Sequence, residues 1–211
     1  MSELIAEKLI DIESVQFSFN EHFTLTSGLK SPVYVDCRKI ISFVKEREFI
    51  MDAAVNYIEK NKLKFDLVAG GETAGIPYSA FISEKLKKPM IYIRKKPKGF
   101  GKNQQIEGSF KKNQVSILIE DLATDGGSKV IFVEAMRKAG LAVRDVFVIF
   151  YYDIFNFEES ALSKLNVNIH SLCTWRDIIS VLEKRNTFNQ NDIENLKEFL
   201  SKPDKWRAKN A

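Results

Sequence analysis

Two adjacent carboxylates stand where an apolar run gives way to small and hydroxyl-bearing residues. Residues 115–119 read Val-Ser-Ile-Leu-Ile, Glu120 and Asp121 follow, and residues 122–128 read Leu-Ala-Thr-Asp-Gly-Gly-Ser. A turn of this composition that opens a helix makes an anion site, because backbone N–H groups are exposed there and glycines let a phosphate approach. The hydroxyl groups of Thr124 and Ser128 add donors. We therefore expect a phosphate group to bind at this turn.

The paired carboxylates would repel a phosphate bound directly beside them. They suit the hydroxyl groups of a sugar, or Mg²⁺, if the phosphate lies further along at Gly126 and Gly127. A simpler interpretation is a helix cap at Asp125 after a polar strand end. It accounts for Asp125 but not for the two acids, the threonine and the two glycines together. The segment predicts a site where a phosphorylated sugar reacts with the help of a divalent metal.

Basic residues gather in one stretch although the whole chain is nearly balanced in charge. The 211 residues include 32 Lys and Arg against 28 Asp and Glu, a net charge of +4, so charge alone does not demand a general nucleic-acid role. Between positions 85 and 112 lie Lys85, Lys87, Lys88, Arg94, Lys95, Lys96, Lys98, Lys102, Lys111 and Lys112. Such a local excess suits a polyanionic ligand, and a solvated surface run would give the same composition.

Short β-branched runs, separated by helical patterns, must position these residues. The runs are Leu67–Ala69, Met90–Ile93, Val115–Ile119 and Val143–Phe150, and the helical patterns cover Gly75–Leu86 and Gly126–Lys138. Strands that alternate with helices predict an α/β fold with a central, mostly parallel sheet flanked by helices. The connection from 95 to 105 holds two glycines, a proline and one large apolar residue, Phe100, which predicts a mobile surface loop.

The two ends of the chain read differently from this middle part. A helix over Glu3–Ser18 and two extended pieces, Phe23–Leu25 and Val33–Val35, around the turn Ser27–Gly28 predict a small N-terminal hood over about 1–40. Helical patterns such as Ile193, Leu196 and Phe199 mark a tail over about 174–211. The sequence contains no linker-like segment or internal repeat, which predicts one domain over 1–211.

Composition also indicates the compartment. The only cysteines, Cys37 and Cys173, show no disulfide spacing and are expected to be reduced, buried thiols. The N-terminus carries charges within its apolar stretch, and no segment approaches the length of a membrane span. These features predict a cytoplasmic protein.

The segment from 115 to 128 resembles the phosphoribosyl-diphosphate fingerprint of the type I phosphoribosyltransferases, in which apolar residues precede two acids and a Thr/Gly-rich turn. Residues 23–36, 70–77 and 94–108 extend the resemblance, in order, to the orotate phosphoribosyltransferase family over about residues 20 to 153. The resemblance implies the type I phosphoribosyltransferase fold. It also implies Mg²⁺-dependent transfer of the phosphoribosyl group from 5-phosphoribosyl 1-diphosphate to orotate, giving orotidine 5′-monophosphate and diphosphate in UMP biosynthesis. The family works as a homodimer with shared active sites.

The resemblance also assigns roles to individual positions. For the sugar diphosphate it implies Glu72, Thr73, Arg94, Lys95, Lys98, Glu120, Asp121, Leu122, Ala123, Thr124, Asp125, Gly126, Gly127 and Ser128. For orotate it implies Lys30, Tyr34, Val35 and Thr124. The implied catalytic residues are Arg94, Lys95, Lys98 and Asp121. A cis peptide is expected at Glu72–Thr73, and Mg²⁺ is expected to arrive mainly through the substrate, without an assigned protein ligand.

The chain departs from the commoner family pattern at several positions. Phe100 stands where many members have a histidine, and Thr26 and Ala74 stand where many have lysines. The segment 151–153, Tyr-Tyr-Asp, lacks the arginine that commonly pairs with the orotate carboxylate, and an unpaired carboxylate in a closed site is costly. Arg38 and Lys30 are the candidates to replace that arginine, although either suits a surface role.

Three other polar side chains have simpler interpretations. Lys96 matches no family role and is predicted to be a solvated surface lysine. His22 and His170 show no metal-ligand spacing and are interpreted as structural.

Two other functions fit part of the pattern. A phosphoribosyltransferase for another base, such as a purine, would share the fingerprint, but the hood segment argues against it. A non-catalytic regulator that senses phosphoribosyl diphosphate would also share it, but the retained Arg94, Lys95 and Lys98 favour catalysis.

Overall fold

The computed structural model describes residues 1–25, 28–97, 105–124, 127–154 and 157–210, which fall into two compact units. One unit joins the two ends of the chain, Met1–Phe43 and Cys173–Ala211, and the other is Val44–Leu172. The hood segment and the tail therefore share one unit. The single domain over 1–211 stays a prediction. Among the described residues, no helix is both long and apolar enough to cross a membrane.

A six-stranded sheet dominates the unit Val44–Leu172. Its strands are β5 (Leu67–Gly71), β6 (Met90–Ile93), β7 (Ile106–Glu107), β8 (Val115–Ala123), β9 (Ala142–Tyr151) and β10 (Asn168–Thr174), in the order β10-β9-β8-β5-β6-β7. The neighbours β6, β5, β8 and β9 run parallel, and β7 pairs antiparallel with β6. The last two residues of β10 belong to the other unit. The predicted α/β fold with a mostly parallel sheet is confirmed.

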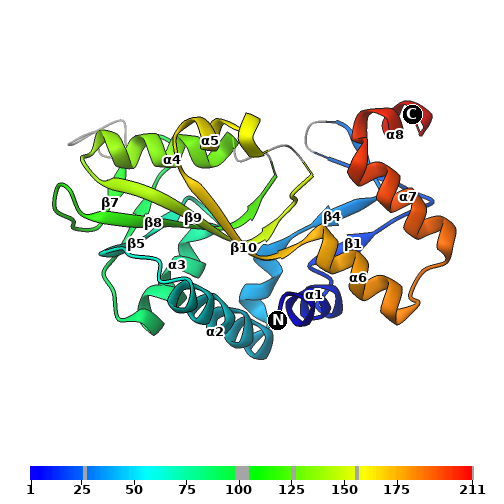
Figure 1. Ribbon diagram of the computed structural model, residues 1–211, viewed down its shortest axis with the longest axis horizontal. Coiled ribbons are helices and arrows are strands. Elements are labelled where there is room, and N and C mark those ends of the chain that lie inside the picture. The colour runs from blue at the N-terminus through cyan, green and yellow to red at the C-terminus, as the bar shows by residue number, and fades with distance from the viewer. Residues whose placement is uncertain (26–27, 98–104, 125–126, 155–156, 211) are drawn as a thin grey trace. The chain divides into compact units, whose positions relative to one another are not determined.

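Helices cover both faces of this sheet (Figure 1). They are α2 (Val44–Lys60) and α3 (Gly75–Leu86) on one face, and α4 (Gly127–Lys138) and α5 (Ala161–Lys164), with the 3₁₀ turn η2 (Phe157–Glu159), on the other. On α4, Phe132, Val133 and Met136 are spaced at three and four residues and lie in the same buried cluster as Leu118 of β8. That spacing gives the helix one apolar face, which the sheet covers. The core therefore holds α4 against β8, the strand whose last residues include Glu120 and Asp121.

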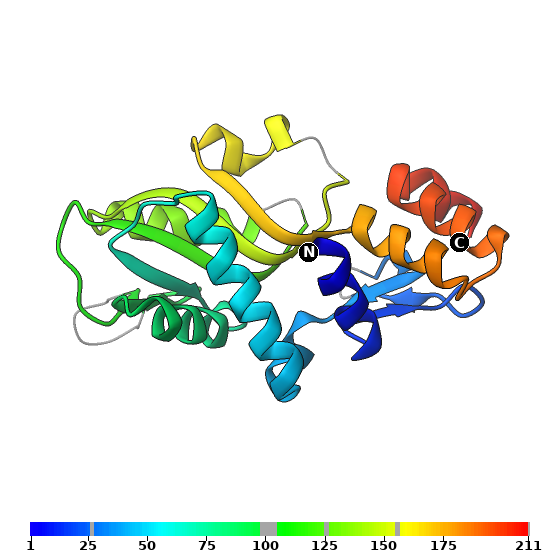
Figure 2. The ribbon, with the colours of Figure 1, turned by 60° about the horizontal axis from the view of Figure 1, so that its bottom comes forward.

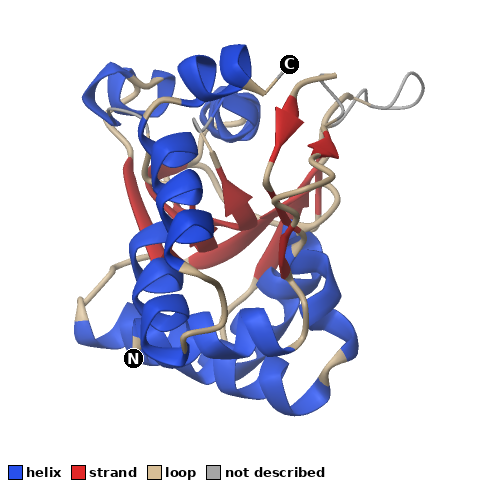
Figure 3. Ribbon diagram, turned by 90° about the vertical axis from the view of Figure 1, so that its right-hand side faces the viewer, coloured by secondary structure: helices blue, strands red, loops and turns tan. Residues whose placement is uncertain are grey.

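The other unit is built from short strands and longer helices (Figure 3). Its elements are α1 (Ser2–Asp11), β1 (Val15–Phe17), β2 (Phe23–Thr24), β3 (Lys30–Ser31), β4 (Val33–Val35), the 3₁₀ helix η1 (Cys37–Ser42), α6 (Trp175–Arg185), α7 (Gln190–Ser201) and α8 (Pro203–Lys209). β1 pairs antiparallel with β4, and β2 pairs antiparallel with β3. α1 lies along α6 (Figure 2), where ion pairs of 2.6 Å join Glu3 to Lys184 and Asp11 to Arg185.

Trp206 of α8 anchors the tail within this unit. Its side chain is 1% exposed, and its ring packs edge-on against His22, with 4.7 Å between centroids, and against Phe199. Next to it, Arg207 Nε donates a hydrogen bond of 3.2 Å to the carbonyl of Lys30 in β3. The C-terminal helix and the β2–β3 hairpin are therefore packed together.

The structure corrects the predicted helix over Glu3–Ser18. The helix ends at Asp11, Glu13 adopts a positive φ of 54°, and residues 15–17 form β1. β1 forms because Val15 pairs with Val35, a partner far along the chain that local periodicity does not reveal. Four further elements, α2, β7, β10 and α8, were not predicted from the residue patterns.

Candidate functional site

Parallel strands bring several predicted site residues to one edge of the sheet. Gly71 at the end of β5 is in register with Ile93 of β6, so Glu72 and Arg94 leave the sheet at the same level. Gly70 is in register with Ile119 of β8, which places Glu120 beside Gly71. The carboxyl ends of parallel strands are where ligands bind in open α/β sheets.

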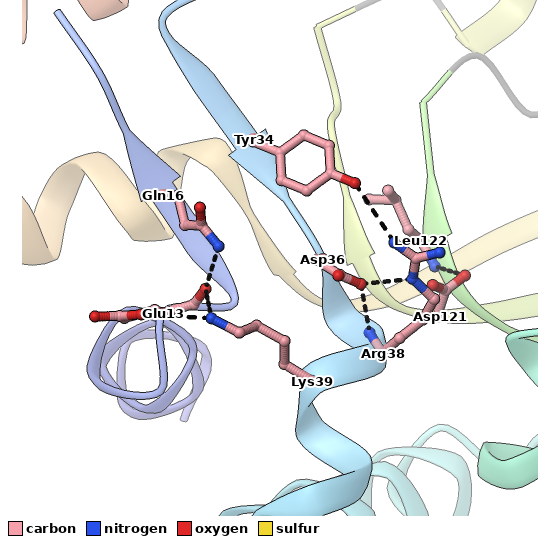
Figure 4. A network of polar contacts seen from close by, with 8 residues as sticks. All are labelled: Glu13, Gln16, Tyr34, Asp36, Arg38, Lys39, Asp121 and Leu122. Carbon is pink, nitrogen blue, oxygen red and sulfur yellow. Dashed lines mark hydrogen bonds and ion pairs between the residues drawn. The ribbon is translucent and has the colours of Figure 1, made fainter. Parts of the chain in front are cut away.

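The two acids of β8 have different environments, because successive side chains of a strand point to opposite faces. Glu120 is 6% exposed, whereas Asp121 is partly exposed. An oxygen of Asp121, Oδ1, accepts a hydrogen bond of 2.8 Å from the backbone N–H of Leu122 (Figure 4). Asp121 is therefore the acid that a ligand can reach directly in this structure.

Glu120 forms a buried ion pair with Lys129, a residue that sequence reasoning did not select. Lys129 Nζ lies 3.3 Å from Glu120 Oε2, and both side chains are less than a tenth exposed. Burial raises the pKa of Glu120 to about 7; Lys129 opposes this rise and the neighbouring Asp121 adds to it. The other oxygen, Oε1, has no hydrogen-bond partner among the described residues.

Two glycines make room for the Glu120 carboxylate. A Cβ atom on Gly71 or on Gly75 would overlap Glu120 Oε1, and on Gly75 it would also overlap the carbonyl oxygen of Ile119. Gly71 ends β5 and Gly75 begins α3. The absence of side chains at these two positions therefore lets the carboxylate lie between β5, α3 and α4.

The turn between β5 and α3 contains the cis peptide that the family resemblance predicts. The bond between Glu72 and Thr73 is cis, which confirms that expectation. Glu72 is partly buried and Thr73 is exposed. Glu72 Oε2 accepts a hydrogen bond of 2.8 Å from the backbone N–H of Lys95, which ties this turn to the residues after β6.

Arg94 and Lys95 begin the basic connection after β6. The backbone N–H of Arg94 donates to the carbonyl of Gln105 over 2.9 Å, and Arg94 Nη1 lies 3.7 Å from Glu107 Oε1. Lys95 and Lys96 are exposed. Lys98 and Phe100 lie outside the described residues, and so does most of the connection that the sequence predicts to be mobile.

The phosphate turn is described in part. Thr124, Gly127 and Ser128 are exposed, and α4 begins at Gly127, as an anion site at a helix start requires. Asp125 and Gly126 lie outside the described residues. Leu122 is partly buried, and the side chain of Ala123 is fully buried, so that Ala123 offers a ligand only its backbone.

The residues predicted to bind orotate from the hood belong to the unit of the chain ends. Lys30 Nζ donates to Thr24 Oγ1 over 3.1 Å, and the Val35 side chain is buried. Figure 4 shows Arg38 between two partners: its Nε donates to Asp36 Oδ1 over 2.6 Å, and its Nη2 donates to the hydroxyl of Tyr34 over 3.4 Å. Arg38 therefore already has an acidic partner, whereas Lys30 is exposed and bound to a neutral oxygen.

Both histidines make structural contacts. His22 packs on Trp206, as described above, and His170 lies between Asp145 and Tyr57, at 2.8 Å from Asp145 Oδ1 and 3.3 Å from the tyrosine hydroxyl. Both cysteines are free and buried. The described part of the chain holds no group of three or more His, Cys, Asp or Glu side chains placed to bind a metal ion.

Comparisons with known proteins add to this geometry. No family model matches the chain. It is 43% identical, over 212 residues, to a protein of Roseobacter denitrificans named orotate phosphoribosyltransferase, covering 100% of this chain and 94% of that protein. It is 46% identical, over 209 residues, to a protein of the same name from Dinoroseobacter shibae, covering 98% of this chain and 92% of that protein. Among solved structures, orotate phosphoribosyltransferase from Aeropyrum pernix superposes with a TM-score of 0.73 at 26% identity, covering 88% of this chain and 99% of that one.

Proposed function

The chain belongs to the orotate phosphoribosyltransferase family, and on that premise we propose how its residues perform the transfer of a phosphoribosyl group from 5-phosphoribosyl 1-diphosphate to orotate. Breaking the bond between C1 of the ribose and the diphosphate leaves positive character on the sugar and negative charge on the leaving group. The site must stabilise both charges. The described edge of the sheet offers the acids Glu120 and Asp121 near the end of β8 and the cations Arg94 and Lys95 after β6.

The acids serve the ribose. Asp121 is partly exposed at the end of β8 and accepts hydrogen bonds from the ribose hydroxyls, while Glu120 adds negative charge from its buried position. Thr124 and Ser128, with Asp125, Gly126 and Gly127, hold the 5-phosphate, and Leu122 and Ala123 contribute through their backbone. The start of α4 supports this role, because exposed N–H groups and hydroxyls attract phosphate oxygens.

The cations serve the diphosphate. Arg94 and Lys95 leave β6 beside the Glu72–Thr73 turn, and the hydrogen bond from Lys95 to Glu72 aligns the two segments. Lys98 joins them in our assignment on the strength of the family resemblance. Charge-assisted contacts to the leaving oxygens then grow stronger as the bond breaks. They therefore lower the free energy of the transition state more than that of the ground state.

Orotate is assigned to Thr124 and to the hood residues Lys30, Tyr34 and Val35. Residues 151–153 supply no arginine for the orotate carboxylate. Lys30 is the better candidate for that carboxylate, because its ammonium group is exposed and paired with a hydroxyl, whereas Arg38 is already neutralised by Asp36.

Mg²⁺ is assigned to the substrate rather than to a protein ligand. The exposed and partly exposed groups at this edge include the carboxylates of Glu72 and Asp121 and the hydroxyl of Thr124, and such hard oxygen surroundings suit an ion that binds mainly through phosphate oxygens. When bound, the ion neutralises charge on the departing diphosphate. A homodimer with shared active sites belongs to the same proposal and rests on the family resemblance. A cytoplasmic location is also part of it and rests on the two free cysteines.

The observation that carries the assignment is the meeting of Glu72, Arg94, Lys95, Glu120 and Asp121 at one sheet edge in a chain with full-length relatives of this family. The test mixes the protein and Mg²⁺ with the sugar diphosphate and one base at a time, and measures the release of diphosphate. Orotate should be consumed, and adenine, guanine and hypoxanthine should not. Turnover of a purine with orotate inert would overturn the choice of base, and binding without release for any base would indicate a sensor.

A further inference from the structure

Lys129 occupies a costly position for a lysine. It is the third residue of α4 and is only 6% exposed. Lysine side chains are almost never fully buried unless paired, and a positive charge in the first turn of a helix opposes the helix dipole. Its burial there therefore requires compensation from its partners.

Those partners connect two parts of the site. Lys129 Nζ lies 3.3 Å from Glu120 Oε2 and donates a hydrogen bond of 3.0 Å to Ser128 Oγ. Glu120 belongs to the acid pair, and Ser128 belongs to the phosphate turn. One buried ammonium group thus holds the carboxylate at the end of β8 and the hydroxyl at the start of α4.

Glu120 has little else to hold its charge. One of its oxygens, Oε1, has no hydrogen-bond partner among the described residues, and it lies so close to Gly71 and Gly75 that a Cβ atom at either position would overlap it. The charged groups that act on it are Lys129 of α4, Asp121 of its own strand and Lys95 after β6, and Lys129 has the largest effect of the three. Desolvation disfavours the ionised form, and the nearby ammonium group is the main charge that opposes this effect.

We propose that Lys129 is a positioning residue of the transferase, which favours the ionised form of Glu120, holds it in place beneath the ribose and ties it to Ser128 of the phosphate turn. The proposal rests on the function proposed above, since it gives Glu120 a task in the reaction. Without the ammonium group, Glu120 would take up a proton or turn toward water. Either change would remove negative charge from beneath the sugar when positive character develops there.

The test is a set of four variants measured with orotate, the sugar diphosphate and Mg²⁺: Lys129→Met, Lys129→Arg, Glu120→Gln and the double variant Glu120→Gln/Lys129→Met. Lys138→Met, at the exposed end of the same helix, is the matched control. At pH 7, Lys129→Met should lower kcat/KM by about 100-fold, mainly through kcat, and Lys129→Arg should restore most of it. The double variant should be no worse than Glu120→Gln alone, because both changes disable the same group.

Dependence on pH separates this role from a merely structural one. If ionised Glu120 is needed, kcat/KM should increase with pH as this carboxylate loses its proton. In Lys129→Met that increase should occur at higher pH, because Glu120 then ionises without a cation beside it. Thermal unfolding of each variant shows whether it is folded, and Lys129→Arg provides the comparison if Lys129→Met does not fold. Multiplied losses in the double variant, or an unchanged pH profile in Lys129→Met, would overturn the proposal. Failure of the wild-type protein to use orotate would instead overturn the proposed function. The coupling between Glu120 and Lys129 would then be measured from the binding of the sugar diphosphate to the same variants by calorimetry.

Discussion

The backbone N–H of Lys95 donates a hydrogen bond of 2.8 Å to Oε2 of Glu72, so the turn after β5 and the segment after β6 are held together. This bond sets where the basic connection starts relative to the Glu72–Thr73 turn. A side chain thereby fixes the backbone of a residue assigned to the diphosphate.

Removal of this acceptor should loosen the cationic side of the site. We expect Glu72→Ala to lower kcat/KM for the sugar diphosphate by about 10-fold to 150-fold, because one hydrogen bond to a charged group contributes about 1.5 to 3 kcal/mol. Glu72→Gln keeps an acceptor oxygen and should lose less. Steady-state kinetics check the order of the three proteins, with Glu84→Ala at an exposed position of α3 as the control. Equal losses for the alanine and glutamine variants would mean that the negative charge, not the hydrogen bond, matters.

The basic connection contains two lysines whose effects should differ. Lys98→Ala should lower turnover by roughly 30-fold to 1,000-fold with little effect on ground-state binding, since it removes a contact to charge that grows in the transition state, about 2 to 4 kcal/mol of barrier. Lys96→Ala, the control, should change little. Pre-steady-state and equilibrium binding measurements separate the two effects, and similar small losses for both lysines would remove Lys98 from the catalytic set.

Mixing of variants tests whether the sites are shared between subunits. Subunits that carry Lys98→Ala, combined with subunits that carry Asp121→Asn, should regain part of the activity if each site takes Lys98 from one chain and Asp121 from the other. The mixed dimer then holds one site with both groups intact. After subunit exchange is verified by mass spectrometry, absence of any recovery would show that each site uses its own chain.

The start of α4 should not tolerate a side chain. Gly127→Val places a branched side chain in the space assigned to the phosphate oxygens, so it should weaken binding of the sugar diphosphate by at least about 10-fold. The variant should remain folded, because Gly127 is exposed. Calorimetric titration checks this expectation, with circular dichroism as the control for folding. Unchanged affinity in the folded variant would place the phosphate elsewhere.

The raised pKa of Glu120 should appear in the pH dependence of stability. Burial lifts this pKa from 4.5 to about 7. Between these values the folded state binds more protons than the unfolded state, so the free energy of unfolding falls as the pH rises through this window and levels off above about 7. Compared with Glu120→Gln, the wild-type protein should lose on the order of 3 kcal/mol between pH 4.5 and pH 7.5. Urea denaturation of both proteins measures the difference, and parallel pH profiles would show that Glu120 titrates normally.

Local patterns in the sequence determined the parts of this protein that depend on neighbours along the chain. The helix Gly75–Leu86 and the strand Met90–Ile93 match the predicted bounds, because apolar periodicity and glycines mark such elements locally. The acids, hydroxyls and glycines at the end of β8 were also readable because they are nearly consecutive, although β8 continues through both acids to Ala123, beyond the predicted strand end at Ile119. The alternation of strands and helices then placed these residues at the carboxyl edge of a parallel sheet.

Tertiary structure decided what depends on distant partners. Glu120 and Asp121 are equivalent in the sequence, and only the packing of α3 and α4 around β8 buries the first and leaves the second accessible. Likewise β1 exists because Val15 pairs with Val35, and Lys129 gains its role from a carboxylate on another element. Such pairings arise when the folded chain brings separated residues together and excludes water between them, and the local residue pattern does not encode that exclusion.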